Sequence, residues 1–214
     1  MYRPADLRRQ ELVALYREVR GCTRCPLSQS RIQVVFGAGN ADADLMFVGE
    51  APGASEDQQG IPFVGRAGNL LNELLGEQGI QRDDVFITNV LKSRPPGNRD
   101  PETSEIEACR PHLERQVELI EPKVICTLGN FATKLLSGSQ QGITKVHGVP
   151  QERTLGARKV LLFPIFHPAA GLRTPSVKEQ LREDFAKLPP LLAASAPAPG
   201  TEQGPPVDQL GLFG

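Results

Sequence analysis

Four short runs of apolar and β-branched residues, separated by segments of helical periodicity, constrain the fold of this chain more than any other feature. The runs are Leu45 to Gly49, Val85 to Val90, Val124 to Leu128 and Val160 to Phe166. Alternation of strands and amphipathic helices is typical of a parallel sheet with helices on both faces. The sequence therefore predicts a three-layer α/β/α sandwich around a central, mainly parallel four-stranded sheet.

Further elements are expected at both ends of this core. An apolar stripe predicts a helix over residues 6–20, Ile32 to Phe36 has the composition of an extra strand, and a last helix begins near Ser176. Pro189 and Pro190 are expected to stop that helix, because proline lacks the backbone N–H that a helix interior needs.

Length and composition indicate one globular domain with a tail. The chain has 214 residues, which corresponds to roughly one domain. Residues 1–190 form the expected domain, and residues 191–208, rich in Ala, Pro and Gly, predict a flexible linker. No apolar run approaches the roughly 20 residues of a membrane helix, and Met1 to Pro4 starts no signal peptide. We therefore expect a monomeric cytoplasmic protein with no membrane partner.

Four cysteines form the first candidate site. They are Cys22 and Cys25 in a Cys-x-x-Cys pair, Cys109 and Cys126. In a reducing compartment such thiols are more often metal ligands or buried core residues than disulfides. Four thiolates suit either zinc or an iron-sulfur cluster, and the spacing alone does not decide between them. The alternative is a Cys-x-x-Cys pair plus two core cysteines, since Cys126 lies inside an apolar run.

Most of the other candidate functional residues follow three of the predicted strands. Because ligands bind at the carboxyl ends of strands in an open parallel sheet, we expect these residues to line one site. They are Glu50, Ala51, Gly53 and Glu56 after the first run, Asn89, Lys92, Arg94 and Arg99 at the second, and His167, Leu172 and Arg173 after the fourth.

The four groups of motifs together resemble the family 4 uracil-DNA glycosylases, iron-sulfur members of the uracil-DNA glycosylase superfamily. They are the four cysteines, the Gly49-Glu50-Ala51-Pro52-Gly53 box, Asn89 before Lys92-Ser93-Arg94-Pro95-Pro96-Gly97-Asn98-Arg99, and His167-Pro168-Ala169-Ala170. The resemblance spans roughly residues 15–188. It implies a structural [4Fe-4S] cluster held by Cys22, Cys25, Cys109 and Cys126, with zinc as the less favoured occupant.

The resemblance also implies that the enzyme removes uracil from single- or double-stranded DNA by extruding the nucleotide into a pocket. Phe63 would stack on the base. Asn89 would accept a hydrogen bond from uracil N3–H and donate one to O4. His167 would donate to O2 as negative charge builds on the base.

Two carboxylates, Glu50 and Glu56, are the candidates for stabilising the sugar cation and orienting water. In family 1 enzymes the corresponding box has an Asp where this chain has Ala51, so water must be handled differently here. We favour Glu50 for this role and expect the Glu56 segment to exclude the thymine methyl. The backbone around Glu50, Ala51 and Gly53 is expected to meet the uracil.

The cationic residues Lys92, Arg94, Arg99 and Arg173 are candidate phosphate contacts, and Leu172 is a candidate wedge in the vacated base stack. The net charge of −1 excludes a uniformly basic surface, but it permits a basic groove.

The last residues suggest a protein partner. Gln209, Leu210, Leu212 and Phe213, in Gln-Leu-Gly-Leu-Phe, resemble the pentapeptide that binds the bacterial sliding clamp. A short peptide of this kind can place apolar anchors in a preformed groove while the linker sets its reach.

The resulting prediction is a monofunctional uracil-DNA glycosylase that acts on DNA in the bacterial nucleoid. One rival is a DNA-binding protein on the same scaffold that is non-catalytic or becomes covalently trapped on uracil DNA. Another is a zinc-stabilised enzyme acting on free nucleotides, which is disfavoured because the chain has no P-loop lysine motif.

Overall fold

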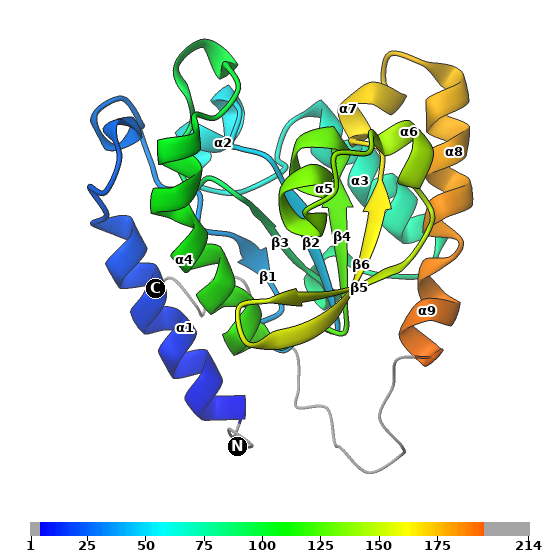
Figure 1. Cartoon of the computed structure of the whole chain (residues 1–214), viewed down its shortest axis with the longest axis horizontal. Coiled ribbons are helices and arrows are strands. Elements are labelled where there is room, and N and C mark those ends of the chain that lie inside the picture. The colour runs from blue at the N-terminus through cyan, green and yellow to red at the C-terminus, as the bar shows by residue number, and fades with distance from the viewer. Residues whose placement is uncertain (1–4, 195–214) are drawn as a thin grey trace.

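A six-stranded sheet runs through the middle of the molecule, and helices cover both of its faces (Figure 1). The structure, a computed structural model of the chain, describes residues 5–194. The rest of the expected linker and the tail residues Gln209, Leu210, Leu212 and Phe213 lie outside the described residues.

The strands are β1 (Ala38–Gly39), β2 (Leu45–Gly49), β3 (Phe86–Asn89), β4 (Val124–Leu128), β5 (Gln151–Leu155) and β6 (Arg158–Ile165). Their order in the sheet is β1-β3-β2-β4-β6-β5. The central strands β3, β2, β4 and β6 are parallel, and the edge strands β1 and β5 are antiparallel to their neighbours. The predicted four-stranded sheet was therefore wrong by its two edge strands.

The α-helices are α1 (Ala5–Arg20), α2 (Ala54–Gln59), α3 (Arg66–Glu77), α4 (Thr103–Ile120), α5 (Gly129–Ser137), α6 (Ile143–Val146), α7 (Pro168–Gly171), α8 (Pro175–Phe185) and α9 (Leu188–Ala194). Short 3-10 turns are η1 (Pro26–Gln29), η2 (Arg82–Asp84) and η3 (Pro96–Asn98). None of the described helices is both long and apolar enough to cross a membrane.

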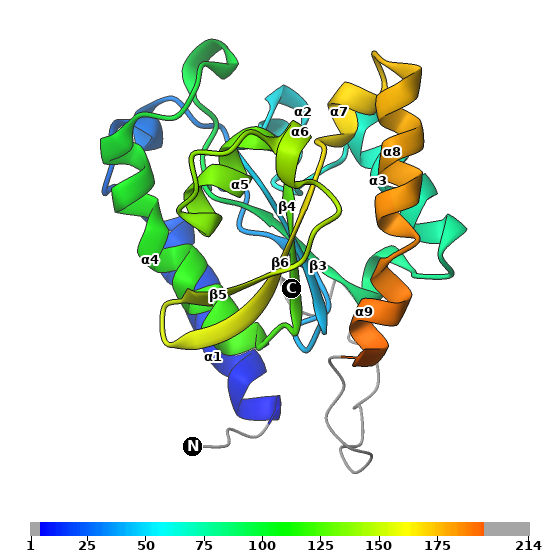
Figure 2. The same ribbon diagram turned by 45° about the vertical axis from the view of Figure 1, so that its right-hand side comes forward.

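Helices α1 and α4 lie on one face of the sheet and α3, α8 and α9 on the other (Figure 2), and a group of buried side chains fills the space on each face. One joins α1 and α4 to the sheet, and the other joins α3, α8 and the start of α9 to the opposite face. The strands β2, β3 and β4 are buried throughout because helices cover both sides, and β6 is buried over its last four residues.

Two predicted element boundaries are wrong. The segment from Ile32 to Phe36 forms no strand, and its backbone bonds partly with loop and side-chain groups, as in Val35 N–H to Lys92 O at 2.8 Å. Pro189 and Pro190 lie in the first turn of α9, where a missing N–H costs nothing. The expected linker at 191–208 therefore begins inside a helix that extends to Ala194.

Candidate active site and cysteine pocket

Three of the predicted substrate-binding side chains lie together at the carboxyl edge of the sheet. Asn89 ends β3 opposite Gly49 at the end of β2. A Cβ added at Gly49 would collide with Asn89 Oδ1 and lie 3.0 Å from Phe63 Cζ, so both side chains pass directly over this glycine. The Phe63 and His167 rings stack with centroids 5.6 Å apart and planes 28° apart.

Asn89 has a side-chain amide with no hydrogen-bond partner among residues 5–194. The residue as a whole is only 2% exposed, but its amide atoms are not among the fully buried unpaired atoms of the described chain. The amide therefore faces the open edge of the sheet, where a ligand can reach it. Its oxygen can accept and its nitrogen can donate, as the edge of a nucleobase requires.

His167 follows β6 and caps the short helix α7. Its Nδ1 accepts a hydrogen bond from the backbone N–H of Ala169 at 3.1 Å. A neutral imidazole with an accepting Nδ1 carries its proton on Nε2. Burial lowers the pKa of His167 to about 4, and the negative charge of Glu56 only partly opposes this. At neutral pH the ring is therefore an uncharged donor through Nε2–H.

Phe63 has a backbone conformation that aromatic residues rarely adopt. Its φ is +53°, a left-handed value that costs on the order of 1–3 kcal/mol. The carbonyl of Phe63 lies so close to Gly68 in α3 that any Cβ there would collide with it. The surrounding structure thus fixes the ring in place despite the strain.

Glu56 holds this loop. Its carboxylate accepts backbone N–H bonds from Gly53 at 3.1 Å, Val64 at 3.2 Å and Gly65 at 3.3 Å. These bonds tie the start of α2 to the residues that follow Phe63. The structure thus gives Glu56 a holding role and does not support it as a catalytic group.

Glu50 is the candidate catalytic carboxylate that is not used in holding the fold within the described residues. It is half-buried directly after β2, and its side chain makes no hydrogen bond within the described part of the chain. Burial, and secondarily the charge of Asp100, raise the pKa of Glu50. Ala51 and Gly53 follow it as the chain enters α2.

The predicted DNA contacts differ in their availability. Lys92 does not reach the surface, because its Nζ is buried and donates to Thr88 Oγ1, Asn89 O and Gln116 Oε1, each at 2.6 Å. Burial lowers its pKa to about 7. A buried amine of this kind does not contact phosphate, so the prediction for Lys92 is corrected.

The arginines and the predicted wedge are nearer to the surface. Arg99 is engaged with the buried Glu105 at 2.6 Å, and Arg94 Nε donates to Asn98 at 2.7 Å. Leu172 is 40% exposed, and Arg173 beside it is exposed too. Leu172, Arg173 and Arg94 are thus the better placed of the predicted DNA contacts.

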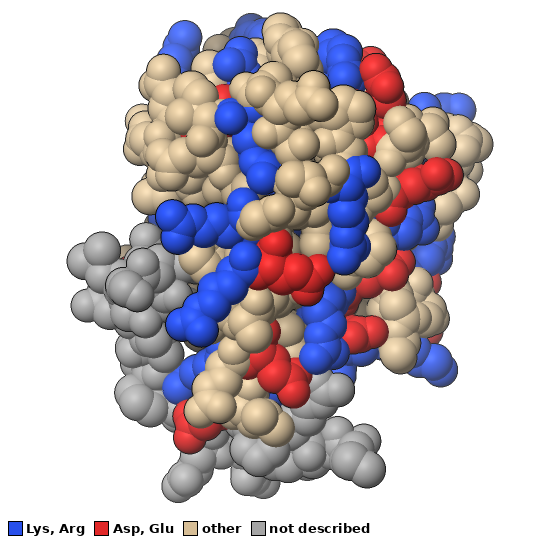
Figure 3. All heavy atoms as spheres, turned by 90° about the vertical axis from the view of Figure 1, so that its left-hand side faces the viewer, with Lys and Arg blue, Asp and Glu red and all other residues tan. Residues whose placement is uncertain are grey.

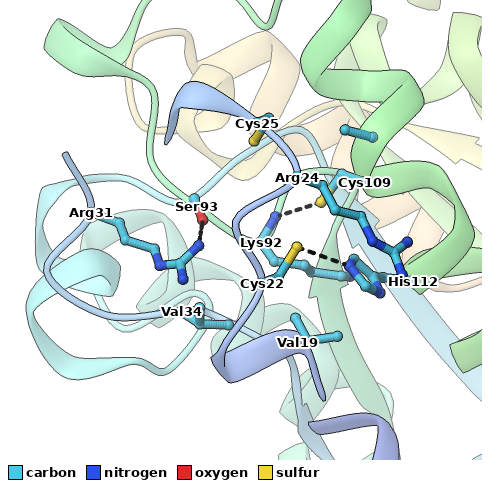
Figure 4. Close-up of a pocket in the computed structure, with 11 residues that line it drawn as sticks. Val19, Cys22, Arg24, Cys25, Arg31, Val34, Lys92, Ser93, Cys109 and His112 are labelled. Atoms are coloured by element: carbon cyan, nitrogen blue, oxygen red, sulfur yellow. Dashed lines mark hydrogen bonds between the residues drawn. The ribbon is translucent and has the colours of Figure 1, made fainter. Parts of the chain in front are cut away.

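Three of the four cysteines line one pocket between the end of α1, the loop after β3 and α4 (Figure 4). They are Cys22, Cys25 and Cys109. The backbone N–H of Lys92 donates to Cys109 Sγ at 3.3 Å, and His112 Nε2 lies 3.4 Å from Cys22 Sγ. Ser93 and Arg31 also line this pocket.

Cys126 does not belong to this pocket, which corrects its prediction as a fourth ligand. It lies in β4, where side chains alternate between faces. Cys126 packs with Val124 and Leu128 on the α3 and α8 face, whereas Ile125 faces α1 and α4. Burial raises the pKa of both Cys126 and Cys109, so it is the face of β4, and not the pKa, that separates Cys126 from the pocket.

The pocket does not fit a single metal ion. Among residues 5–194, no three His, Cys, Asp or Glu side chains are grouped closely enough to hold one. A structural zinc needs its thiolate ligands about 2.3 Å from one point. Cys22, Cys25 and Cys109 line one space, and cysteine thiolate is the ligand type that iron-sulfur clusters bind.

Sequence reasoning missed His112, Ser93 and Gly49 as parts of these sites. His112 lies three residues after Cys109 on α4, a spacing that puts both side chains on one helix face. Ser93 was recognised as part of the Lys92 to Arg99 motif, but its position in the cysteine pocket needs the fold. Gly49 was recognised as part of a motif, but its close approach to Asn89 needs the strand pairing.

The comparisons with known proteins agree with this arrangement. The family model of the uracil DNA glycosylase superfamily matches residues 36–188. The chain belongs to this superfamily. It is 48% identical to a type-4 uracil-DNA glycosylase of Sulfurisphaera tokodaii over 176 residues, 80% of each chain. The type-4 enzyme of Thermotoga maritima is 48% identical over 183 residues, 84% of this chain and 94% of the relative. That of Archaeoglobus fulgidus is 43% identical over 192 residues, 88% of this chain and 96% of the relative. The predicted family 4 membership is confirmed.

Proposed function

We propose that this protein is a uracil-DNA glycosylase, which extrudes uracil from DNA, hydrolyses its N-glycosidic bond and leaves an abasic site. The observation that carries the proposal is the unpaired amide of Asn89 beside the Phe63 and His167 rings. The family to which the chain belongs supports the same assignment.

Asn89 selects the base. Its Oδ1 accepts from uracil N3–H and its Nδ2 donates to O4, whereas cytosine presents the opposite polarity at both positions. Phe63 supplies the stacking surface, and the backbone amides of Glu50 and Ala51 meet the uracil oxygens.

His167 and Glu50 act on the two halves of the breaking bond. The C1′–N1 bond breaks with its electron pair going to uracil, and Nε2–H of His167 donates to O2 as the charge develops. Glu50 stabilises the sugar cation, and water bonds to C1′ while its proton passes to this carboxylate. Lys92 lies close to Asn89, but its amine is held by three bonds, which favours hydrolysis without a lyase step.

The remaining residues bind DNA or hold the cluster. Arg94 and Arg173 contact phosphates, Leu172 fills the vacated stack, and the enzyme acts as a monomer on single- or double-stranded DNA. Cys22, Cys25 and Cys109 hold a structural [4Fe-4S] cluster. A DNA substrate places the protein on the nucleoid of a bacterial cytoplasm.

An oligonucleotide assay tests this function. Incubation with a uracil-containing strand followed by alkali should produce cleavage at uracil, and a matched thymine strand should stay intact. A protein that binds the uracil strand without releasing base, or that migrates with it as a covalent adduct in a denaturing gel, would instead support the non-catalytic or trapping rival.

The tail at Gln209, Leu210, Leu212 and Phe213 is proposed to bind the sliding clamp. Binding would raise the local concentration of enzyme at newly copied DNA without altering the active site. A titration with the host clamp should show binding by the whole chain and none after deletion of Gln209 to Gly214, with oligonucleotide cleavage equal for both. Binding that survives the deletion, or is absent from the whole chain, would contradict this proposal.

A further inference from the structure

The cysteine pocket contains a fourth candidate ligand that is not a cysteine. Ser93 follows Lys92 in the loop after β3, and its exposed fraction is 6%. Figure 4 shows its hydroxyl and the sulfur atoms of Cys22, Cys25 and Cys109 arranged around the same space. Cys126, the remaining thiol, lies on the other face of the sheet.

We propose that Ser93 Oγ is the fourth ligand of the iron-sulfur cluster of this protein. The inference rests on the cluster proposed above and specifies how this chain completes it with only three available cysteines. On binding, the Oγ–H bond breaks, an iron–oxygen bond forms and the proton is released to solvent.

Arg31 provides the charge that such a ligand needs. Its NH1 donates to Ser93 Oγ at 3.3 Å. A serine hydroxyl alone is a weak acid, and a neighbouring guanidinium favours its deprotonated form by charge and by hydrogen bonding. Arg31 is half-buried, so water screens this interaction less than it would at the surface.

Two neighbouring ligands have the same kind of support. The backbone N–H of Lys92 donates to Cys109 Sγ at 3.3 Å, and His112 Nε2 lies 3.4 Å from Cys22 Sγ, close enough to donate to it. Outer hydrogen bonds of this type orient metal ligands and tune the metal. In this arrangement His112 and Arg31 are positioning residues, and Ser93 occupies the ligand place.

An oxygen ligand makes one iron different from the other three. Iron in these clusters prefers soft thiolate, so the iron bound to Ser93 should be the one lost most easily. One-electron oxidation by ferricyanide converts [4Fe-4S]2+ to [4Fe-4S]3+, which releases one Fe2+ and leaves [3Fe-4S]+. The serine should make this loss faster than a cysteine would.

The test uses the full chain, reconstituted anaerobically with iron and sulfide, in five forms: unchanged, Ser93→Cys, Ser93→Ala, Cys126→Ser and His112→Ala. Iron and sulfide per chain are measured, together with the electron paramagnetic resonance signal after one equivalent of ferricyanide. We expect about four irons in the unchanged protein and in Cys126→Ser. Ser93→Ala should hold about three and show the [3Fe-4S]+ signal before oxidant is added. Ser93→Cys should keep its fourth iron several-fold longer than the unchanged protein under ferricyanide.

Three results would overturn the proposal. These are a full iron content with unchanged oxidation kinetics in Ser93→Ala, a loss of cluster in Cys126→Ser, or stoichiometric zinc that is lost in His112→Ala. Uracil cleavage is assayed in parallel on the unchanged protein, so a failure of the ligand assignment with intact cleavage is distinct from a failure of the proposed function.

Discussion

At the scale of single residues, burial sets the protonation states of two candidate catalytic side chains, His167 and Glu50. His167 is held neutral by burial, with its proton placed on Nε2 by the Ala169 N–H. Glu50 is half-buried, which raises its pKa, and the negative charge of Asp100 raises it further. The imidazole stays uncharged through most of the working range, whereas Glu50 loses its charge as the pH falls.

This difference predicts the acid side of the pH profile. The active form of Glu50 is the carboxylate, so the single-turnover rate should fall as the pH drops through the raised pKa of Glu50. His167 keeps its neutral form down to its pKa of about 4, so its titration does not contribute to the limb above that pH. Replacing Asp100 with Asn removes a negative charge and lowers the pKa of Glu50, so the acid limb should move to lower pH.

The control is Glu152→Gln, a substitution of an exposed acid on β5. Rates measured from pH 4.5 to 9 should coincide for this variant and the unchanged protein. An acid limb that stays in place in Asp100→Asn, or that persists in Glu50→Gln, would show that another group titrates.

The residue positions that the sequence predicted well are those at strand ends. Asn89 and His167 follow strands, and parallel strands bring such residues to one edge. The roles of Glu56 and Lys92 were not predictable, because their partners come from other segments: Gly65 for Glu56 and Gln116, on α4, for Lys92. A charged side chain in a loop looks exposed until its partners are known.

At the scale of elements, the pairing of β2 with β3 sets the distance between Asn89 and the rest of the pocket. Gly49↔Asn89 is the last pair of this ladder. Gly49→Ala should lower the excision rate at least tenfold, because its methyl group would displace Asn89 Oδ1 and press on the Phe63 ring. Overpacking of this kind also costs about 1–3 kcal/mol of stability.

A matched control is Gly76→Ala in α3, where an added Cβ meets nothing within 4 Å. This change should stabilise the protein by about 0.5–1 kcal/mol by favouring helix, without altering excision. Full activity in Gly49→Ala would contradict the close packing proposed around Asn89.

Glu56 links α2 to the loop that carries Phe63. Glu56→Ala should lower the free energy of unfolding by about 1–3 kcal/mol, because three backbone N–H groups lose their acceptor. Glu56→Gln keeps one acceptor oxygen and should recover part of that loss. Urea unfolding followed by circular dichroism measures both. If Glu56→Gln abolished excision with stability unchanged, Glu56 would be a catalytic group after all.

The central strands were predictable as elements because β2, β3 and β4 are continuous buried runs and β6 ends in one. The edge strands were not, since β5 is half-exposed and polar, and β1 has only two residues. Edge strands are often short and polar, so a search for apolar runs passes over them.

At the scale of the whole molecule, the two sites lie in different parts of the sandwich. Asn89, Phe63 and His167 lie at the carboxyl edge of the sheet, and the cysteine pocket lies between α1, α4 and the loop after β3. The residues from Asn89 to Ser93 connect them. A cluster bound in the cysteine pocket would support the α1 and α4 layer from there.

The face formed by α1 and α4 carries both signs of charge (Figure 3). Acidic and basic side chains interleave over its lower part, and mainly basic and uncharged side chains cover its upper part. A net charge of −1 therefore coexists with a local excess of basic side chains on this face.

The place of Cys126 could not be predicted from the sequence either. Four cysteines in one chain suggest one site until the face of β4 on which Cys126 lies is known.

The measurement that tests the central claim most directly compares His167→Ala with the unchanged protein on one uracil oligonucleotide. Single-turnover excision and binding to an abasic-site analogue are measured in parallel. The excision rate of His167→Ala should be lower by about 10²–10³-fold with binding nearly unchanged, because the Nε2–H bond matters most when the base carries charge. An unchanged rate, or equal losses in rate and binding, would contradict that claim.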